Sequence, residues 1–298
     1  MTDRLEIRQE TTTAQRLALL KRGGRMTKFK GQVASFAPSC LAIDLGPATQ
    51  AASTIALAAG MLMAPLTVSG SAIAGGCLYT GVDTYTCSTP AAPGFDTTLS
   101  LTGFSNLTVS TQLGFGHDTF VTGGDAINLS TIGLGTISFT DIYNSTIQGN
   151  TRGLEIDGPT GGGAITVYSN GTISGYNNDG INIVSETAAP LPPSGPGPLL
   201  GVRVEVRDVT GGSGPAASAS ADGIEITNTG PLGVSVSSTG TVSGKDDGIK
   251  VTTGGGVVIS GVNVNAQSGT AIDASAGNFD LNGVSVTTTG LVQSTGGA

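Results

Sequence analysis

The chain has 298 residues, of which 48 are glycine and 4% are aromatic, with no tryptophan. A core with so few aromatic rings must be filled by Val, Ile, Leu and Ala in thin layers, and 11% charged residues are too few for an acidic disordered segment. From Cys77 onward, 17 acidic residues stand against five basic ones, a net charge of −12 that excludes nucleic acid as a partner. The composition favours repetitive β structure.

The first 76 residues are expected to be an extended signal peptide and export region. Eight of the 13 Lys and Arg residues lie within the first 30 positions, and an uncharged run follows at 51–68. Ala72 and Ala74 form an A-x-A cleavage pattern, so cleavage is predicted to leave Gly75 as the new N-terminus. A retained membrane anchor is the alternative, because the uncharged run approaches the ~20 residues that span a bilayer.

Residues 77–124 are predicted to form an N-terminal cap closed by a disulfide. Cys77 and Cys87 stand ten residues apart in an exported chain, which is typical of one small disulfide loop. Lipoprotein processing at Cys77 is the weaker alternative. No metal site is expected there, since no second cysteine pair or nearby histidine completes a four-ligand set.

Residues 125–298 carry an internal repeat. Each copy has a small residue followed by apolar, polar and apolar residues, usually after Asp. The copies are Asp125-Ala126-Ile127-Asn128-Leu129, Arg152-Gly153-Leu154-Glu155-Ile156, Asp179-Gly180-Ile181-Asn182-Ile183, Asp222-Gly223-Ile224-Glu225-Ile226, Asp247-Gly248-Ile249-Lys250-Val251 and Thr270-Ala271-Ile272-Asp273-Ala274. A fixed period of this kind is the signature of stacked repeats.

The copies begin 27, 27, 43, 25 and 23 residues apart. The long step contains Pro190 to Pro198, so a proline-rich loop inserted at 186–200 is expected to account for it. Each repeat also holds a second alternating strand, such as 164–167, and a third, such as 171–175. Glycine before each first strand is expected to supply a sharp corner.

Three short strands cannot bury their apolar faces within one repeat, so the repeats must stack. The sequence predicts an all-β fold, a right-handed single-stranded parallel β-helix with about 25 residues per coil. One interior column should contain Ile127, Leu154, Ile181, Ile224, Ile249 and Ile272, while Asn128, Glu155, Asn182, Glu225, Lys250 and Asp273 should face solvent. On this interpretation Glu225→Lys changes stability little. A β-sandwich is the competing fold, but it predicts no constant period.

Two segments are similar to known catalytic or calcium-binding motifs. Asp246 and Asp247 are similar to the paired aspartates of polygalacturonases, so a carbohydrate-active β-helix enzyme is the alternative function. No His or Arg follows them, and no Lys follows Lys250, so a turn leading into a repeat strand is favoured. Residues 114–120 fit one calcium-binding nonapeptide, but turn chemistry is favoured there, with His117 at the surface or in a turn.

A long basic signal, an A-x-A site, an early cysteine pair and Asp-Gly-Ile repeats together resemble the N-terminal passenger region of bacterial autotransporters. The resemblance implies a non-catalytic passenger protein without cofactor, adhesive or structural in role, displayed at the cell surface or secreted. Glycans or a host surface would be its partners. Members of that family are exported through a C-terminal outer-membrane β-barrel, a translocator that these 298 residues lack.

Overall fold

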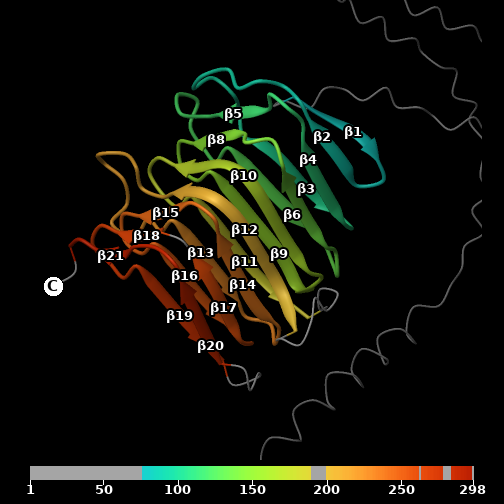
Figure 1. Ribbon diagram of the computed structural model, residues 1–298. Helices are drawn as coiled ribbons and strands as arrows, with labels where there is room; N and C mark the ends of the chain where they lie inside the picture. The colour runs from blue at the N-terminus through green and yellow to red at the C-terminus, as the bar shows by residue number, and fades with distance from the viewer. Residues whose placement is uncertain (1–75, 189–198, 262, 278–282, 297–298) are drawn as a thin grey trace, which may run out of the picture. The chain divides into compact units, whose positions relative to one another are not determined.

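The computed structural model describes residues 76–188, 199–261, 263–277 and 283–296 (Figure 1). The expected cleavage site at Ala72, Ala74 and Gly75 and the proline-rich segment 190–198 lie outside the described residues. The part of the chain that the structure describes is all-β, and it contains no helix of the length and apolar character needed to cross a membrane.

The described strands are short, and most alternate between buried and exposed residues. In chain order they are β1 (Cys77–Gly81), β2 (Thr84–Cys87), β3 (Leu99–Phe104), β4 (Leu107–Thr111), β5 (Gly116–Asp118), β6 (Ile127–Thr131), β7 (Ile137–Asp141), β8 (Thr146–Gly149), β9 (Leu154–Gly162), β10 (Ile165–Gly175), β11 (Ile181–Thr187), β12 (Leu200–Thr210), β13 (Ile224–Asn228), β14 (Gly233–Ser238), β15 (Thr241–Gly244), β16 (Ile249–Thr253), β17 (Val257–Gly261), β18 (Asn263–Ala266), β19 (Ile272–Ala276), β20 (Val284–Thr288) and β21 (Val292–Ser294).

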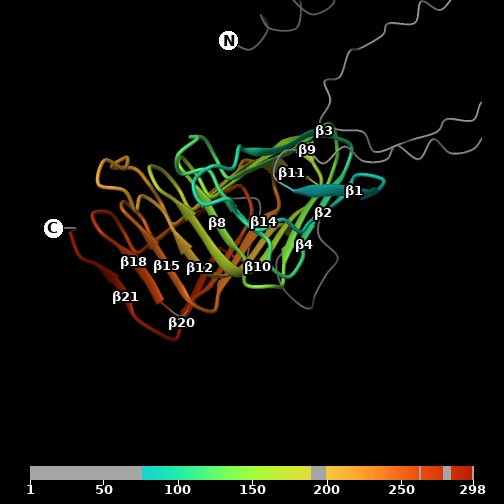
Figure 2. The same ribbon diagram turned by 90° about the horizontal axis from the view of Figure 1, so that it is seen from above.

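These strands form a 14-stranded sheet and a 7-stranded sheet. The smaller sheet runs β19-β16-β13-β11-β9-β6-β3, so each member comes from a different repeat. The larger sheet takes the second and third strands of each repeat, which join into one long strand in β10 and in β12. Every pairing is parallel except that of β1 with β2, and Figures 1 and 2 show the successive repeats lying side by side.

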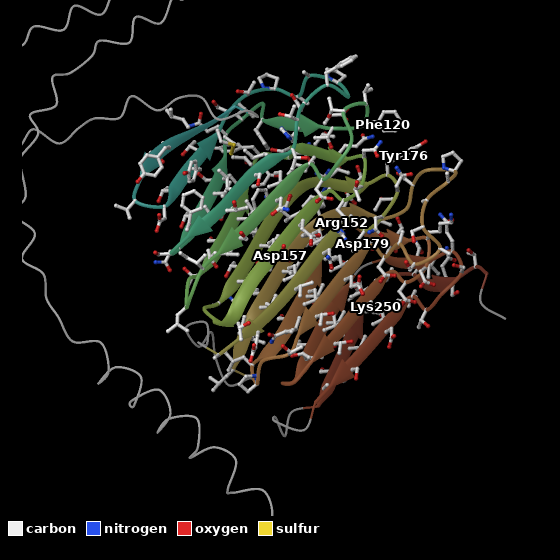
Figure 3. The ribbon with its side chains drawn as sticks, turned by 180° about the vertical axis from the view of Figure 1, so that it is seen from behind. Phe120, Arg152, Asp157, Tyr176, Asp179 and Lys250 are labelled. Atoms are coloured by element: carbon white, nitrogen blue, oxygen red, sulfur yellow. A yellow bond between two sulfur atoms is a disulfide. The ribbon has the colours of Figure 1, made fainter. Side chains whose placement is uncertain are left out.

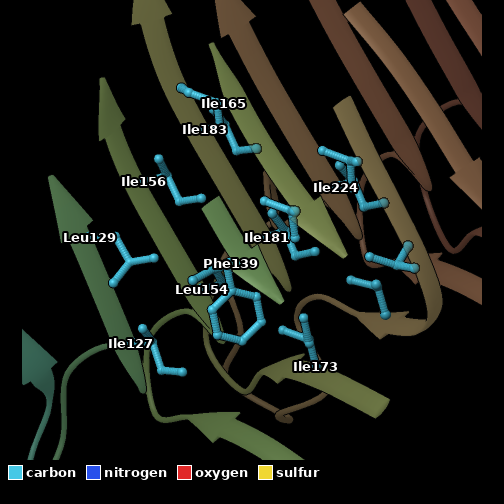
Figure 4. Packing of buried hydrophobic residues seen from close by; sticks show 14 of the residues in the cluster. Ile127, Leu129, Phe139, Leu154, Ile156, Ile165, Ile173, Ile181, Ile183 and Ile224 are labelled. Atoms are coloured by element: carbon cyan, nitrogen blue, oxygen red, sulfur yellow. The ribbon is translucent and has the colours of Figure 1, made fainter. Parts of the chain in front are cut away.

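The interior column follows from this register. Leu154, Ile181, Ile224, Ile249 and Ile272 each pair with the equivalent residue of the preceding repeat, and Ile127 begins the series. The first five of the six predicted column residues are fully buried, whereas Ile272 in the last unit is partly exposed. Figure 4 shows four of them, Ile127, Leu154, Ile181 and Ile224, packed with Phe139 from the facing sheet. Thin aliphatic layers therefore fill the core.

The stack begins one unit earlier than the predicted boundary at residue 125. Leu99 in β3 pairs in parallel with Ile127, and β4 and β5 pair in the same way with β7 and β8. The segment 77–124 is therefore a hairpin followed by a complete repeat unit. The Asp-Gly-Ile pattern missed this unit because Thr97 and Thr98 stand where the later repeats carry Asp and Gly.

The 43-residue step contains two long connections, so the expected loop at 186–200 accounts for only part of it. Residues 186–187 belong to β11 and residue 200 to β12, which leaves 188–199 between these strands. The second connection, 211–223, replaces the short corner 176–180 of the preceding repeat. It packs onto the stack, because an added Cβ at Gly214 would lie 2.6 Å from Cε1 of Tyr176.

The hairpin β1–β2 covers the first end of the stack. Cys77 and Cys87 face each other in its antiparallel register and form a disulfide. Strand β2 then pairs in parallel with β4, and Tyr85 packs edge to face against Phe104. Cys77, Cys87 and Tyr85 are buried, so the hairpin extends the apolar core at this end.

Reduction of the disulfide is expected to lower the free energy of unfolding by about 3 kcal/mol, the chain-entropy value for a loop of this length. The same loss is expected for Cys77→Ser combined with Cys87→Ser, because both changes release the hairpin from the first unit. Thermal unfolding with and without reductant measures the effect, and the double variant, which has no disulfide to lose, should not respond to reductant. An unchanged midpoint for the reduced wild-type protein would contradict this expectation.

Candidate functional site

The corner that leads into the seven-stranded sheet carries a ladder of aspartate side chains. Each carboxylate accepts a hydrogen bond from the backbone N–H of the equivalent residue one unit later. The pairs are Asp125 with Arg152 (3.1 Å), Asp179 with Asp222 (2.9 Å), Asp222 with Asp247 (2.9 Å) and Asp247 with Thr270 (2.6 Å). Backbone N–H groups that would otherwise be orphaned at a corner are satisfied in this way, which explains the Asp of the repeat.

The glycine that follows each aspartate is required by close packing between units. A Cβ added at Gly180 would lie 2.7 Å from the carbonyl oxygen of Gly223, and one at Gly223 would lie 2.4 Å from that of Gly248. None of these three glycines has a positive φ. The expected sharp corner is therefore not the reason for glycine here; the close approach of successive backbones is.

The polar column beside the ladder is held together by ion pairs (Figure 3). Nε of Arg152 lies 3.2 Å from Oε2 of Glu155 and 3.3 Å from Oδ2 of Asp179, and Figure 3 shows Arg152 beside Asp179. The side-chain amide of Asn182 donates to both oxygens of Glu155, at 3.0 and 3.2 Å. As a result Glu155 and Asn182 are buried, and the expectation that all six outward residues face solvent is wrong for these two.

A second set of contacts surrounds the ammonium group of Lys250. Its Nζ lies 3.1 Å from Glu225 and 3.4 Å from Asp222, which is fully buried. Burial lowers the pKa of Lys250, but the hydrogen bond to Glu225 and the charge of Asp222 outweigh it and raise the pKa above its usual value. Because Glu225 is paired with Lys250, we no longer expect Glu225→Lys to leave stability unchanged.

Burial also raises the pKa values of two carboxyl groups on this face. It raises the pKa of Glu155 to about 7, although Arg152 and Asn182 favour the ionised form. It raises the pKa of Asp222 to about 6, against the effects of the Asp247 N–H and Lys250. Perturbed carboxyl groups mark candidate functional sites, but internal ion-pair networks produce the same shifts.

Glu155→Gln is expected to remove part of the pH dependence of stability. The folded pKa of Glu155, about 7, lies above its ordinary value of 4.5, so the folded state holds a proton that the unfolded state has lost. Stability therefore falls as pH rises from about 4.5 to 7, by up to about 3 kcal/mol for this group. Urea unfolding at pH 5 and pH 8 should give a smaller difference for the variant.

The matched control is Glu205→Gln, which changes a carboxylate that is 47% exposed on β12. This variant should keep the wild-type difference between pH 5 and pH 8. If Glu155→Gln also kept it in full, the buried carboxyl would not be the source of the pH dependence.

Two groups of carboxylates come close enough to hold a cation. Oxygens of Asp179, Asp222 and Glu225 lie within 4.8 Å of one another, and so do those of Asp222, Asp246 and Asp247. These are the oxygen ligands that hard divalent cations prefer. In the first group, however, the Lys250 ammonium already contacts Asp222 and Glu225 and supplies positive charge there.

The remaining predicted residues lie elsewhere. His117 is buried at the first end of the stack, with Nε2 2.9 Å from the carbonyl oxygen of Thr97 and its ring stacked on Phe115, so its expected surface or turn position is wrong. Asp118 accepts a hydrogen bond from the N–H of Phe120, as in an Asx turn. Asp246 and Asp247 occupy the corner before β16.

Sequence reasoning missed two internal polar residues of the larger and smaller sheets. The buried Asp141 carboxylate accepts from the hydroxyls of Thr111 (2.7 Å), Ser145 (2.8 Å) and Ser169 (3.0 Å). Asn228 is equally buried, accepts from the N–H and hydroxyl of Thr187 and donates to the carbonyl of Leu232. Both stand at the last position of a strand, and that position also carries Thr111, Thr131, Thr187 and Thr253, the one available signal.

The fold and the polar face define an all-β protein of stacked parallel repeats in which Arg152 and Lys250 pair with carboxylates of the same face. The chain matches no protein-family model, no curated protein and no solved structure.

Proposed function

We propose that this chain is a non-catalytic passenger protein, exported and displayed at the cell surface or secreted, with an adhesive or structural role. In this proposal the stacked units are coils of a right-handed parallel β-helix. The two parallel sheets, with one strand of the smaller and two of the larger per unit, support that architecture. The resemblance of the signal region and repeats to autotransporter passengers supports the route, through a translocator outside these residues.

The observation that carries the proposal is the use made of the acidic residues. Asp125, Asp179, Asp222 and Asp247 hold the backbone of the following unit, and Arg152 and Lys250 are committed to neighbouring carboxylates. Side chains bound in this way stabilise the stack and are poorly placed to move protons during a reaction. The face they leave to solvent is long and regular, which suits weak contacts repeated many times.

Glycans are the proposed ligands of this face. Exposed hydroxyl and carboxylate groups, such as Thr252 on β16, Ser275 on β19 and Asp157 on β9, can bond sugar hydroxyls but offer no deep pocket, so single contacts should be weak. The test compares binding of the full chain to free glycans in solution with binding to the same glycans at high density on beads. Binding should strengthen at least about 100-fold on beads. Equal and negligible binding in both formats would overturn the adhesive role.

Surface display is tested separately in cells that produce the full chain. A tag inserted in the segment 190–198 should become accessible to antibody and protease on intact cells, and the N-terminus of exported material should be Gly75. An N-terminus at Met1, or a tag protected until lysis, would overturn the export route without bearing on glycan binding.

The close approach of Asp222, Asp246 and Asp247 favours one second candidate, a polysaccharide hydrolase. Turnover of polygalacturonate that is lost in Asp246→Asn would support it. The non-catalytic proposal expects no turnover from either protein. Asp273→Asn, which changes an exposed carboxylate in β19, is the matched control.

A further inference from the structure

No other strand of the described chain covers the interior face of the unit β19–β20–β21. Val284 and Val286 are each 46% exposed, whereas their partners in β17, Val257 and Ile259, are 1% exposed. Val292 shows the same contrast with Val264. Together with Ile272 and Ala274 of β19, these residues line a groove of about 460 Å³. The apolar column of the core thus continues into solvent at this end.

The backbone is also unpaired along this end. Within the described chain, β19 pairs only with β16, β20 only with β17 and β21 only with β18. In Figure 1 these three strands form the border of the molecule beside the C-terminus. Open strand edges beside exposed valines are a template for another chain, since both hydrogen bonds and apolar burial are available there.

Among the described residues, the apolar core is better covered at the other end of the stack. Leu99, Leu101 and Phe115 of the first unit are buried, and the disulfide-closed hairpin and Tyr85 lie over that end. A contact between one uncovered end and one covered end would therefore bury less of the exposed core than a contact between two uncovered ends. Contact between two uncovered ends uses the same surface on both copies, and it closes after two chains.

Charge favours the end unit over the rest of the surface for a contact between two copies. The chain from Cys77 onward has a net charge of −12, so two copies repel each other over most of their surfaces. Strands β19, β20 and β21 carry one charged residue, Asp273. The end unit spans residues 270–277 and 283–296 within the described chain, close to the roughly 20 to 30 residues per side of a standard interface.

We propose that two copies of this protein associate end to end through β19, β20 and β21, with a two-fold axis perpendicular to the stack. Facing ends bring the strands of the two copies together in antiparallel pairs, unlike the parallel pairs within each chain. Val284, Val286 and Val292 become buried against the partner. This proposal does not depend on the passenger function.

The test is the mass of the full chain in solution, measured by sedimentation and light scattering from about 1 to 100 µM. The wild-type protein should shift from monomer to dimer and stop there. Val286→Asp should remain monomeric throughout, since it places two like charges in the interface. Val184→Asp is the matched control, because Val184 is 44% exposed on β11, away from the end unit; it should dimerise like the wild type.

Hydrogen exchange of the wild-type protein gives a reading that needs no variant. Amides of β20 and β21 should become more protected as concentration rises, while those of β1 should not change. A wild-type protein that stays monomeric at 100 µM, a dimer that Val286→Asp leaves intact, or growth beyond two chains would each overturn the proposal.

Discussion

Ile224→Asp is expected to unfold the protein or to reduce its free energy of unfolding by at least about 5 kcal/mol. Ile224 is fully buried between Ile181 and Ile249 in the interior column. An aspartate there must either ionise without a partner cation or stay protonated without its hydrogen bonds, and both outcomes cost several kcal/mol. The whole net stability of a domain is only about 5–15 kcal/mol. Urea unfolding followed by circular dichroism measures the loss.

The control must lie on the solvent side of the same sheet. Thr252→Asp in β16 changes an exposed side chain and should alter stability by no more than about 0.5 kcal/mol. Glu225→Lys is unsuitable as a control, because it would place a second ammonium beside Lys250. Equal losses for Ile224→Asp and Thr252→Asp would show that the column is not the core of the stack.

Asp141→Ala is expected to cost about 3–5 kcal/mol, because it leaves several buried donors without an acceptor. Besides the three hydroxyl groups, the N–H groups of Tyr143 (3.1 Å) and Ser145 (3.3 Å) donate to this carboxylate. Asp141→Asn keeps the size of the side chain and an acceptor oxygen, so its loss should be smaller. Denaturant unfolding at pH 7 ranks the three proteins.

The pH dependence of stability distinguishes the effect of the charge of Asp141 from that of its size and shape. Burial raises the pKa of Asp141, but its hydrogen bonds outweigh burial and hold the pKa below the usual value of 3.8. The stabilisation is therefore present above about pH 4 and is lost as pH falls through the folded pKa. Asp141→Asn should lose less stability than the wild type below pH 4. If both lost the same amount, the carboxylate would not be ionised in the folded state.

The repeat period predicted the strands and their register because the interior is the same at every level. An Ile, Leu or Val must lie over its equivalent one unit earlier. The sequence therefore repeats these apolar residues at a spacing near 25 residues. The pattern did not identify the first unit, because its apolar pair, Leu99 and Leu101, has no Asp-Gly before it. The connection 211–223 was not predicted, because its packing against Tyr176 depends on a neighbouring unit and not on the local sequence pattern.

The polar face was predicted less well for a related reason. Alternation tells which side of the sheet Glu155 and Asn182 occupy, but their burial depends on the reach of Arg152 from a neighbouring corner. The distance over which a long side chain extends does not show as a repeating pattern in the sequence. The inward Asp141 breaks the apolar alternation of β7, and only its hydroxyl partners in adjacent units explain it.

The aspartate ladder gives the stack a polarity. Each carboxylate belongs to the earlier unit and the N–H that it accepts belongs to the later one, at Asp179 and Asp222 and again at Asp222 and Asp247. A unit that has formed thus presents a ready acceptor to the segment that is synthesised next. The disulfide-closed hairpin at Cys77 and Cys87 lies at the first end of this series, where it would present the first edge for such assembly. Assembly from it resembles templated polymerisation, in which every added coil costs only its own ordering entropy.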